Sequence, residues 1–322
     1  MSKMSLWIVG APRSGTTLTR NLMNLHPQIA LCRFESHFVP MLLKRHYELG
    51  RTDAPQAVID QAVRIVCGSR LHADGVSAGI EVPRKKLRED LSRGSWPLIL
   101  MTLLENWSDG GGGRTVVWGD KTPLYVESID EIYTALEKRA LFLHVVRDPR
   151  AQAASERATF GKAYRSSAMA WRRRLELATN SQASRDGAVL QVRYEDLVAD
   201  PTSTLAPVIN ALGLDPFDWD GSVPESDALG TSKGLAQVGA SATEVRLSGL
   251  SPRAIRAVER ICGEVASSIG YDVSTVGAST PVWPTRAILR LVGRARLVSY
   301  IFRTSGARAG LSKLRATARE RS

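Results

Sequence analysis

The feature that most constrains the fold is an apolar segment, residues 6–9, which leads through a glycine-containing turn into a helix-compatible stretch at residues 18–25. Gly10, Gly15 and Thr17 mark the turn with the spacing G-x4-G-x-T. A buried strand that passes into a helix in this way points several backbone N–H groups at an anion, and the spacing matches the phosphate-binding loop G-x4-G-K-[ST]. The segment therefore predicts an α/β fold with an anion site at the end of its first strand.

The turn departs from the phosphate-binding pattern at Thr16, which stands where that pattern has lysine. The cation of the turn is Arg13 instead. Because the lysine of the pattern contacts the β- and γ-phosphates of a nucleoside triphosphate, its absence argues against such a ligand. We expect the turn to bind a ligand with a shorter 5′ anionic group.

Strand-like and helix-like segments alternate along the rest of the chain. Four further buried strands are predicted, at residues 29–32, 115–118, 141–146 and 189–192. Helices are predicted at residues 38–49, 54–67, 83–91, 96–107, 124–136, 171–184 and 252–269. This alternation predicts a central parallel sheet with helices on both faces, which is a P-loop-like three-layer sandwich.

Three cations follow predicted strands at the point where each strand ends. Arg13 follows the first strand, Lys121 follows the strand at 115–118, and Arg147 follows the strand at 141–146. Because the carboxyl ends of parallel strands meet at one edge of a sheet, we expect these side chains to gather there and to bind a ligand with several anionic groups. Glu35 lies at the same edge and is a candidate general base.

Two of these segments resemble one known family. The sequence PRSGTT at residues 12–17 is similar to the 5′-phosphosulfate loop of sulfotransferases that use 3′-phosphoadenosine 5′-phosphosulfate (PAPS). The sequence VRDPR at residues 146–150, with Ser155 eight residues after Arg147, resembles their 3′-phosphate site. Further matches, WGDKTP at 118–123 and YEDL at 194–197, extend the resemblance to the bacterial and tyrosylprotein branches over residues 5–272.

The resemblance implies a role for each matched residue. The residues implied to bind the donor are Arg13, Ser14, Gly15, Thr16 and Thr17 at the 5′ end, and Arg147 and Ser155 at the 3′-phosphate. Arg13 and Lys121 are implied to stabilise the bridging oxygen during transfer. Lys233 lies in a segment that resembles the family's lid over the nucleotide, although a solvated lysine is the alternative. Tyr194 is either a packing residue or a ligand contact, and no metal is expected.

The catalytic base has two candidates in the same short segment. Glu35 matches the glutamate of the tyrosylprotein branch when one residue is inserted before Cys32. His37 is two residues away and points the same way in an extended segment. His144 does not fit, because it lies inside a predicted strand. We favour Glu35 as the base.

These assignments imply transfer of a sulfuryl group from PAPS to an acceptor hydroxyl, with a lipid, a glycan, a small metabolite or a tyrosine as the acceptor. One alternative is a P-loop kinase for a small molecule, which is disfavoured by the missing lysine. The other is a non-catalytic protein, associated with a membrane or a nucleic acid, that retains the nucleotide fold. Glu35, Lys121 and the two phosphate motifs, which are residues 12–17 and residues 146–150 with Ser155, are all intact and argue against it.

The net charge of +11 is concentrated at the end of the chain. Residues 281–322 hold ten basic side chains and one acidic side chain, so the remainder is nearly neutral. We therefore predict a sulfotransferase domain at residues 1–275 and a basic helical tail at 281–322. Residues 283–303 form an amphipathic basic helix on a helical wheel, suited either to an anionic membrane surface or to packing on the domain or a partner subunit.

Cysteine usage bears on the cellular compartment. The three cysteines form no CxxC or CxxH pair, which indicates neither a disulfide framework nor a zinc site. With no signal peptide or membrane span expected, we predict a cytoplasmic protein, peripheral at the inner membrane face if the tail binds lipid. Nucleic-acid binding is not expected, because the tail lacks a reader motif. The oligomeric state stays open, with a dimer among the possibilities.

Overall fold

The computed structural model describes residues 4–108, 115–219 and 250–273. Its centre is a five-stranded sheet of order β2-β3-β1-β4-β5, in which every neighbouring pair is parallel. The strands are β1 (Met4–Gly10), β2 (Ile29–Leu31), β3 (Val117–Lys121), β4 (Ala140–Val146) and β5 (Val189–Arg193). All five carboxyl ends therefore lie along one edge of the sheet, as the alternating pattern predicts.

The central strand β1 owes its place to a continuous apolar run. Leu6, Trp7, Ile8 and Val9 are all fully buried, as expected of a strand covered on both faces. Successive side chains of a strand point to opposite faces of the sheet, so they pack against different helix layers and contribute to two separate cores. Leu6 and Ile8 belong to one cluster, whereas Trp7 and Val9 belong to the other.

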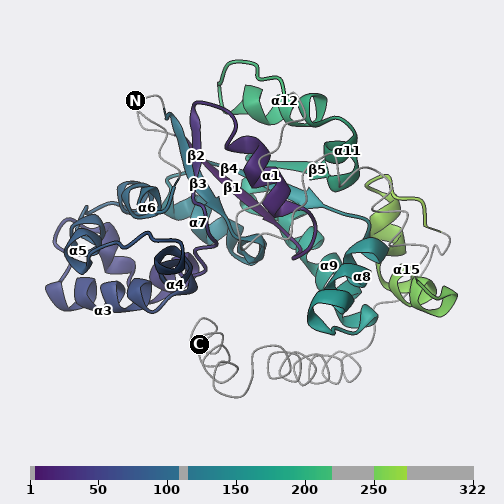
Figure 1. Cartoon of the computed structure of the whole chain (residues 1–322), viewed down its shortest axis with the longest axis horizontal. Helices are drawn as coiled ribbons and strands as arrows, with labels where there is room; N and C mark the ends of the chain where they lie inside the picture. The colour runs from purple at the N-terminus through teal and green to yellow at the C-terminus, as the bar shows by residue number, and fades with distance from the viewer. Residues whose placement is uncertain (1–3, 109–114, 220–249, 274–322) are drawn as a thin grey trace.

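Helices cover both faces, which confirms the three-layer α/β sandwich (Figure 1). The layer packed on Leu6 and Ile8 contains α1 (Thr16–Met23), α11 (Tyr194–Ala199) and α12 (Pro201–Ala211). The opposite layer contains α2 (Val39–Arg45), α6 (Trp96–Glu105), η2 (Pro123–Ser128) and α7 (Ile129–Ala135). A lobe made of η1 (Tyr47–Gly50), α3 (Gln56–Cys67), α4 (Arg70–Ser77) and α5 (Arg84–Leu91) continues this layer at one end of the molecule in Figure 1.

A third cluster joins the helices at the other end of the molecule (Figure 1). These helices are α8 (Pro149–Phe160), α9 (Tyr164–Thr179) and α15 (Pro252–Ser267), and α10 (Gln182–Arg185) follows α9. Ser251 caps α15, since its side chain accepts a hydrogen bond from the backbone N–H of Ala254. Gly270 has φ 84° just after the helix, as expected for its stop.

Several predicted boundaries were wrong. The strand expected at 115–118 begins at Val117 and runs through Gly119 to Lys121, because residues 4–8 of β1 pair with its whole length. The helix expected at 124–136 is a 3-10 helix followed by a short α-helix. The one expected at 38–49 is a short α-helix followed by a 3-10 helix. The helix expected at 171–184 begins earlier and ends at Thr179.

Strand β5 corrects a second expectation. It was predicted to be buried, but only Val192 of its five residues is, because β5 is the edge strand and has a partner on one side only. Helix α4 was not predicted at all, since its sequence RLHADGVS mixes polar residues with a glycine. The tail at 281–322 and Lys233 lie outside the described residues. None of the helices in the described ranges is long and apolar enough to cross a bilayer.

Candidate active site

The loop between β1 and α1 is a tight turn that only glycine permits at two positions. Gly10 has φ 153° and Gly15 has φ 100°, a region that favours glycine. A Cβ atom on Gly10 would lie 2.5 Å from the carbonyl oxygen of Val145 in β4. Helix α1 begins at Thr16, and the backbone N–H groups of a first helical turn have no partner within the helix. The turn therefore has the geometry of an anion site.

Helix α8 and the end of β4 hold this turn in place. The Nε atom of Arg13 donates a hydrogen bond to the Oγ atom of Ser155 over 3.2 Å. The side-chain amide of Gln152 donates to the carbonyl oxygen of Pro12 over 2.8 Å. A guanidinium nitrogen of Arg147 lies 3.4 Å from the carbonyl oxygen of Arg13, to which it donates. The structure thus brings the two phosphate motifs together into one site.

Tyr194 packs against both phosphate motifs. The guanidinium carbon of Arg147 lies 4.3 Å from the centre of the Tyr194 ring. A Cβ atom on Gly15 would approach the same ring to 2.2 Å. Tyr194 is itself buried, and its ring therefore lies between the two motifs and contacts both.

A buried hydroxyl tests whether an anionic ligand fits the turn. Ser14 is fully buried, and its Oγ atom has no hydrogen-bond partner among the described residues. A buried polar group without a partner costs free energy. A ligand oxygen that accepts this hydrogen bond removes the cost, so the turn fits a phosphate or sulfate group.

Asp148 and Arg150 have structural roles in the second motif. The Asp148 side chain caps α8 by accepting from the backbone N–H groups of Arg150 and Ala151. Arg150 pairs with Asp148 at 2.8 Å and with the buried Glu259 of α15 at 2.9 Å. These pairs join α8 to α15. Arg147, the residue directly before Asp148, is directed instead at the turn, where it donates to Arg13.

A second cluster lies at the ends of β2 and β3. The Nζ atom of Lys121 lies 2.5 Å from Oε1 of Glu35, and Nε2 of His37 lies 3.0 Å from Oε2 of the same carboxylate. Lys121 is almost fully buried, whereas the Glu35 side chain is 30% exposed and therefore accessible to a substrate. His37 has φ 56°, a strained value for a non-glycine residue, and such strain is often found at functional sites.

The electrostatics of the Glu35 carboxyl are set by competing effects. Burial raises its pKa, but the charge of Lys121 and the contact with His37 outweigh burial and hold the pKa well below its usual range. The carboxylate is therefore ionised at neutral pH. The neighbouring Asp120 is more deeply buried, and burial raises its pKa despite hydrogen bonds from Thr122 and Ser36.

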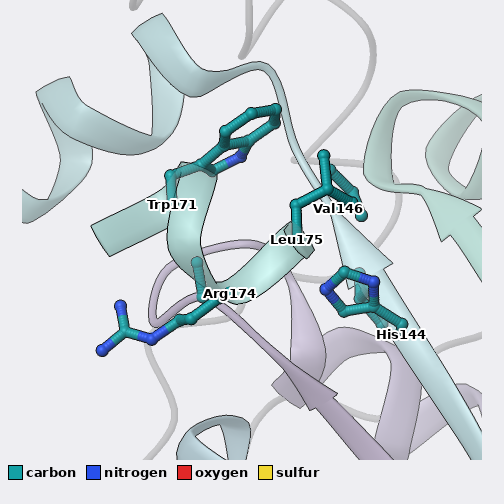
Figure 2. A pocket seen from close by; sticks show the side chains of 7 residues that line it. His144, Val146, Trp171, Arg174 and Leu175 are labelled. Carbon is teal, nitrogen blue, oxygen red and sulfur yellow. The ribbon is translucent and has the colours of Figure 1, made fainter. Parts of the chain in front are cut away.

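His144 lies away from this cluster, in a small hollow between β4 and α9 (Figure 2). Figure 2 shows its ring facing the helix that carries Trp171, Arg174 and Leu175, with the Arg174 guanidinium directed away from it. Burial lowers the pKa of His144 to about 4, so the imidazole is neutral at pH 7. Its position inside β4 agrees with its exclusion as a base.

Sequence reasoning missed three residues that shape the site. Gln152 holds the turn from α8, and Ser36 and Tyr125 hold the segment that carries Glu35. Their partners lie 84 to 140 residues away along the chain, so local spacing carries no signal for them. The position of Ser36 directly after Glu35 was the only hint.

The chain combines a parallel α/β sheet with a tight turn between β1 and α1 and with cations at the carboxyl ends of the two strands that flank β1, Lys121 in β3 and Arg147 after β4. The Sulfotransferase family model matches residues 6–220, which is more than half of the chain. The chain therefore belongs to the sulfotransferase family.

Individual relatives and solved structures are similar to this chain. Protein-tyrosine sulfotransferase 1 of Danio rerio is 22% identical over 281 residues, which cover 84% of this chain and 69% of the relative. The sulfotransferase domain of the Synechococcus PCC 7002 olefin synthase superposes with a TM-score of 0.50 at 22% identity, covering 83% of this chain and 94% of that domain. The sulfotransferase domain of the curacin biosynthetic pathway has a TM-score of 0.49 at 19% identity, covering 85% and 99%.

Proposed function

We propose that this sulfotransferase takes its sulfuryl group from PAPS, transfers it to an acceptor hydroxyl and releases adenosine 3′,5′-bisphosphate (PAP). The observation that carries the proposal is the hydrogen bond between Arg13 and Ser155 at 3.2 Å. It joins the turn suited to a 5′ anion to the motif suited to a 3′-phosphate. A donor with anionic groups at both ends matches this pair of subsites.

The residues proposed to hold the donor fall into two groups. The 5′ end is held by Arg13, Ser14, Gly15, Thr16 and Thr17, through side-chain groups and the backbone N–H groups of the first turn of α1. Arg147 and Ser155 hold the 3′-phosphate, since a guanidinium forms strong charge-assisted hydrogen bonds to phosphate oxygens. Tyr194 keeps the two groups in register, and Lys233, which lies outside the described residues, is proposed to contact the nucleotide.

The residues proposed for catalysis are Glu35, Lys121 and Arg13. PAPS supplies an activated sulfuryl group whose S–O bond to the 5′-phosphate breaks as the acceptor oxygen attacks. Lys121 and Arg13 stabilise the charge that develops on the bridging oxygen. Glu35 removes the acceptor proton. The pKa of Glu35 rises, which makes it a stronger base, when the Lys121 ammonium moves from the carboxylate towards the bridging oxygen.

Ligand binding tests the donor. We expect PAP to raise the melting temperature of the full chain, and ATP and NAD to have no comparable effect. Stabilisation by ATP but not by PAP would overturn the proposal in favour of a small-molecule kinase. Stabilisation by PAP without any transfer would favour a non-catalytic protein that retains the fold.

Transfer itself is tested with labelled PAPS. Incubation of the chain with donor carrying labelled sulfate and with lipid, glycan, protein and metabolite fractions of a cell extract should label one fraction. Mass spectrometry of the product then identifies the acceptor hydroxyl. A Glu35→Gln variant that binds PAP as tightly and turns over as fast as the wild type would remove Glu35 from the mechanism.

A further inference from the structure

The segment that carries Glu35 has little local structure to fix it. Within the described chain, residues 33–38 belong to neither a helix nor a strand. Its tightest feature is a three-residue turn, in which the N–H of Phe38 donates to the carbonyl oxygen of Ser36 over 2.7 Å. His37 is the central residue of this turn, with φ 56°, a conformation that is rare and strained. Contacts from elsewhere in the fold must hold such a segment in place.

Ser36 makes three such contacts. Its backbone N–H donates to Oγ1 of Thr122 over 3.1 Å, and its hydroxyl donates to Oδ2 of Asp120 over 2.7 Å. The same hydroxyl lies 2.6 Å from the hydroxyl of Tyr125, which accepts from the backbone N–H of Val39. Ser36 and Thr122 are fully buried, and Asp120 and Tyr125 nearly so, which shields these hydrogen bonds from water.

The network runs parallel to the contact between Glu35 and Lys121. Two consecutive residues of the loop, Glu35 and Ser36, meet two consecutive residues at the end of β3, Lys121 and Asp120. Side chains of adjacent strand residues point to opposite faces, so Asp120 faces the buried network while Lys121 is left for the site. The strand that supplies the cation therefore also supplies the anchor for the residue next to the carboxylate.

Asp120 is a costly residue to keep for stability alone. It is 1% exposed, and its Oδ1 atom has no hydrogen-bond partner among the described residues. Burying a carboxylate with one oxygen unsatisfied costs free energy, and a buried charge is weak evidence for a stabilising role. Holding Ser36, and through it Glu35, accounts for its presence.

We propose that Ser36, Asp120, Thr122 and Tyr125 form a positioning network that holds the Glu35 carboxylate against Lys121 in the geometry that sulfuryl transfer requires. This inference rests on the proposed function. None of the four residues needs to touch the donor or the acceptor; they act through Glu35. Misplacement of a catalytic group by about 1 Å is enough to reduce turnover by about 100-fold.

Hydroxyl deletions test the network. Ser36→Ala and Thr122→Val should each lower kcat by about 10- to 100-fold, while the KM for PAPS and the Kd for PAP change by less than about twofold. Thr122→Ser restores the hydroxyl and should recover most of kcat. Turnover is measured from labelled PAPS into the extract fraction that the wild type labels, and Kd by calorimetry with PAP. Equal kcat in Thr122→Val and Thr122→Ser would overturn the inference.

A control variant separates positioning from stability. Ser69 is another buried serine, which caps α4 away from the site. Ser69→Ala should lower the melting temperature and leave kcat unchanged. If Ser36→Ala behaves in the same way, its role is structural and the inference is wrong.

A double-mutant cycle tests whether Ser36 acts through Glu35. Ser36→Ala should have little further effect on the residual turnover of Glu35→Gln, because the group that it positions is already absent. Multiplicative losses would show an independent role and overturn the inference. A wild type that neither binds PAP nor labels any fraction overturns the proposed function and this inference together, whereas an active wild type with a fully active Ser36→Ala overturns only the inference.

Discussion

Arg13 and Ser155 are 142 positions apart in the chain, yet the guanidinium Nε of one donates a hydrogen bond to the hydroxyl of the other over 3.2 Å. This contact makes the two phosphate motifs a single unit. Arg147 reinforces it by donating to the carbonyl oxygen of Arg13. A ligand that binds one motif therefore meets a partly preorganised second motif, which lowers the entropic cost of binding.

Removal of the Arg147 guanidinium should weaken PAP binding. Because Arg147 is 5% exposed, its hydrogen bonds to a phosphate are shielded from water, and charge-assisted hydrogen bonds contribute about 1.5–3 kcal/mol. Arg147→Ala should therefore raise the Kd for PAP by roughly 10- to 100-fold, as measured by calorimetry. Arg157→Ala, which removes an exposed arginine of α8, is the control and should leave Kd unchanged. Equal losses in both variants would contradict the assignment.

A methyl group at Gly15 should disturb the turn through Tyr194. Gly15→Ala places a Cβ atom 2.2 Å from the Tyr194 ring and adds strain at φ 100°. The free energy of unfolding should fall by about 1–3 kcal/mol, and PAP binding should weaken. Gly213 has φ 66° and open space around an added Cβ atom. Gly213→Ala should therefore lower the free energy of unfolding less, by the backbone strain alone. Tyr194→Ala in the Gly15→Ala background should recover part of the loss if the clash is the cause.

The ion pair at Glu35 should make stability depend on pH. The folded-state pKa of Glu35 is held below its reference value of 4.5, so the ionised form stabilises the fold above that pH. As pH falls below about 4.5, the unfolded chain takes up the proton first, so this contribution begins to decline and is fully lost only below the folded-state pKa. The difference in unfolding free energy between wild type and Glu35→Gln should therefore be largest near pH 7 and shrink towards pH 4. Urea unfolding at both pH values measures it, and a difference independent of pH would contradict the pairing.

The pairing of Arg150 with Glu259 should stabilise the last described helix. Glu259 is 1% exposed and accepts from Arg150 over 2.9 Å, so Glu259→Gln removes a buried charge–charge contact. We expect a loss of about 1–3 kcal/mol in unfolding free energy, because Arg150 then keeps Asp148 as its one charged partner among the described residues. Glu264→Gln on the exposed side of the same helix should change it little. Denaturant unfolding of the two variants measures the difference.

The basic tail at 281–322 is proposed to bind an anionic membrane surface. Full-length protein should co-sediment with vesicles that contain phosphatidylglycerol, and the binding should weaken with added salt. A 1–280 variant should stay in the supernatant. Equal recovery of both proteins in the pellet would contradict membrane binding and favour packing of the tail on the domain or on a partner subunit.

The order of the strands along the chain could be predicted from local pattern, but their order in the sheet could not. Residues 6–9 are apolar throughout because β1 is central, and this pattern is visible in the sequence. β5 has a similar pattern but occupies an edge of the sheet. Its position is set by its pairing with β4, which the local pattern does not show. The end of β3 was missed for the same reason: Gly119 and Asp120 are poor strand formers, and their pairing with β1 overrides that preference.

The amino-acid sequence by itself determined the two phosphate motifs, the absence of lysine at Thr16 and the family to which the chain is similar. These depend on spacing within a few residues, where backbone geometry is local. Only the tertiary structure decided that Arg13 meets Ser155 and that Glu35 pairs with Lys121, 86 positions away. It also decided that Asp120 anchors Ser36. Contacts of this kind arise because parallel strands distant in the chain end at one edge of the sheet, and no periodicity in the sequence records which side chains meet there.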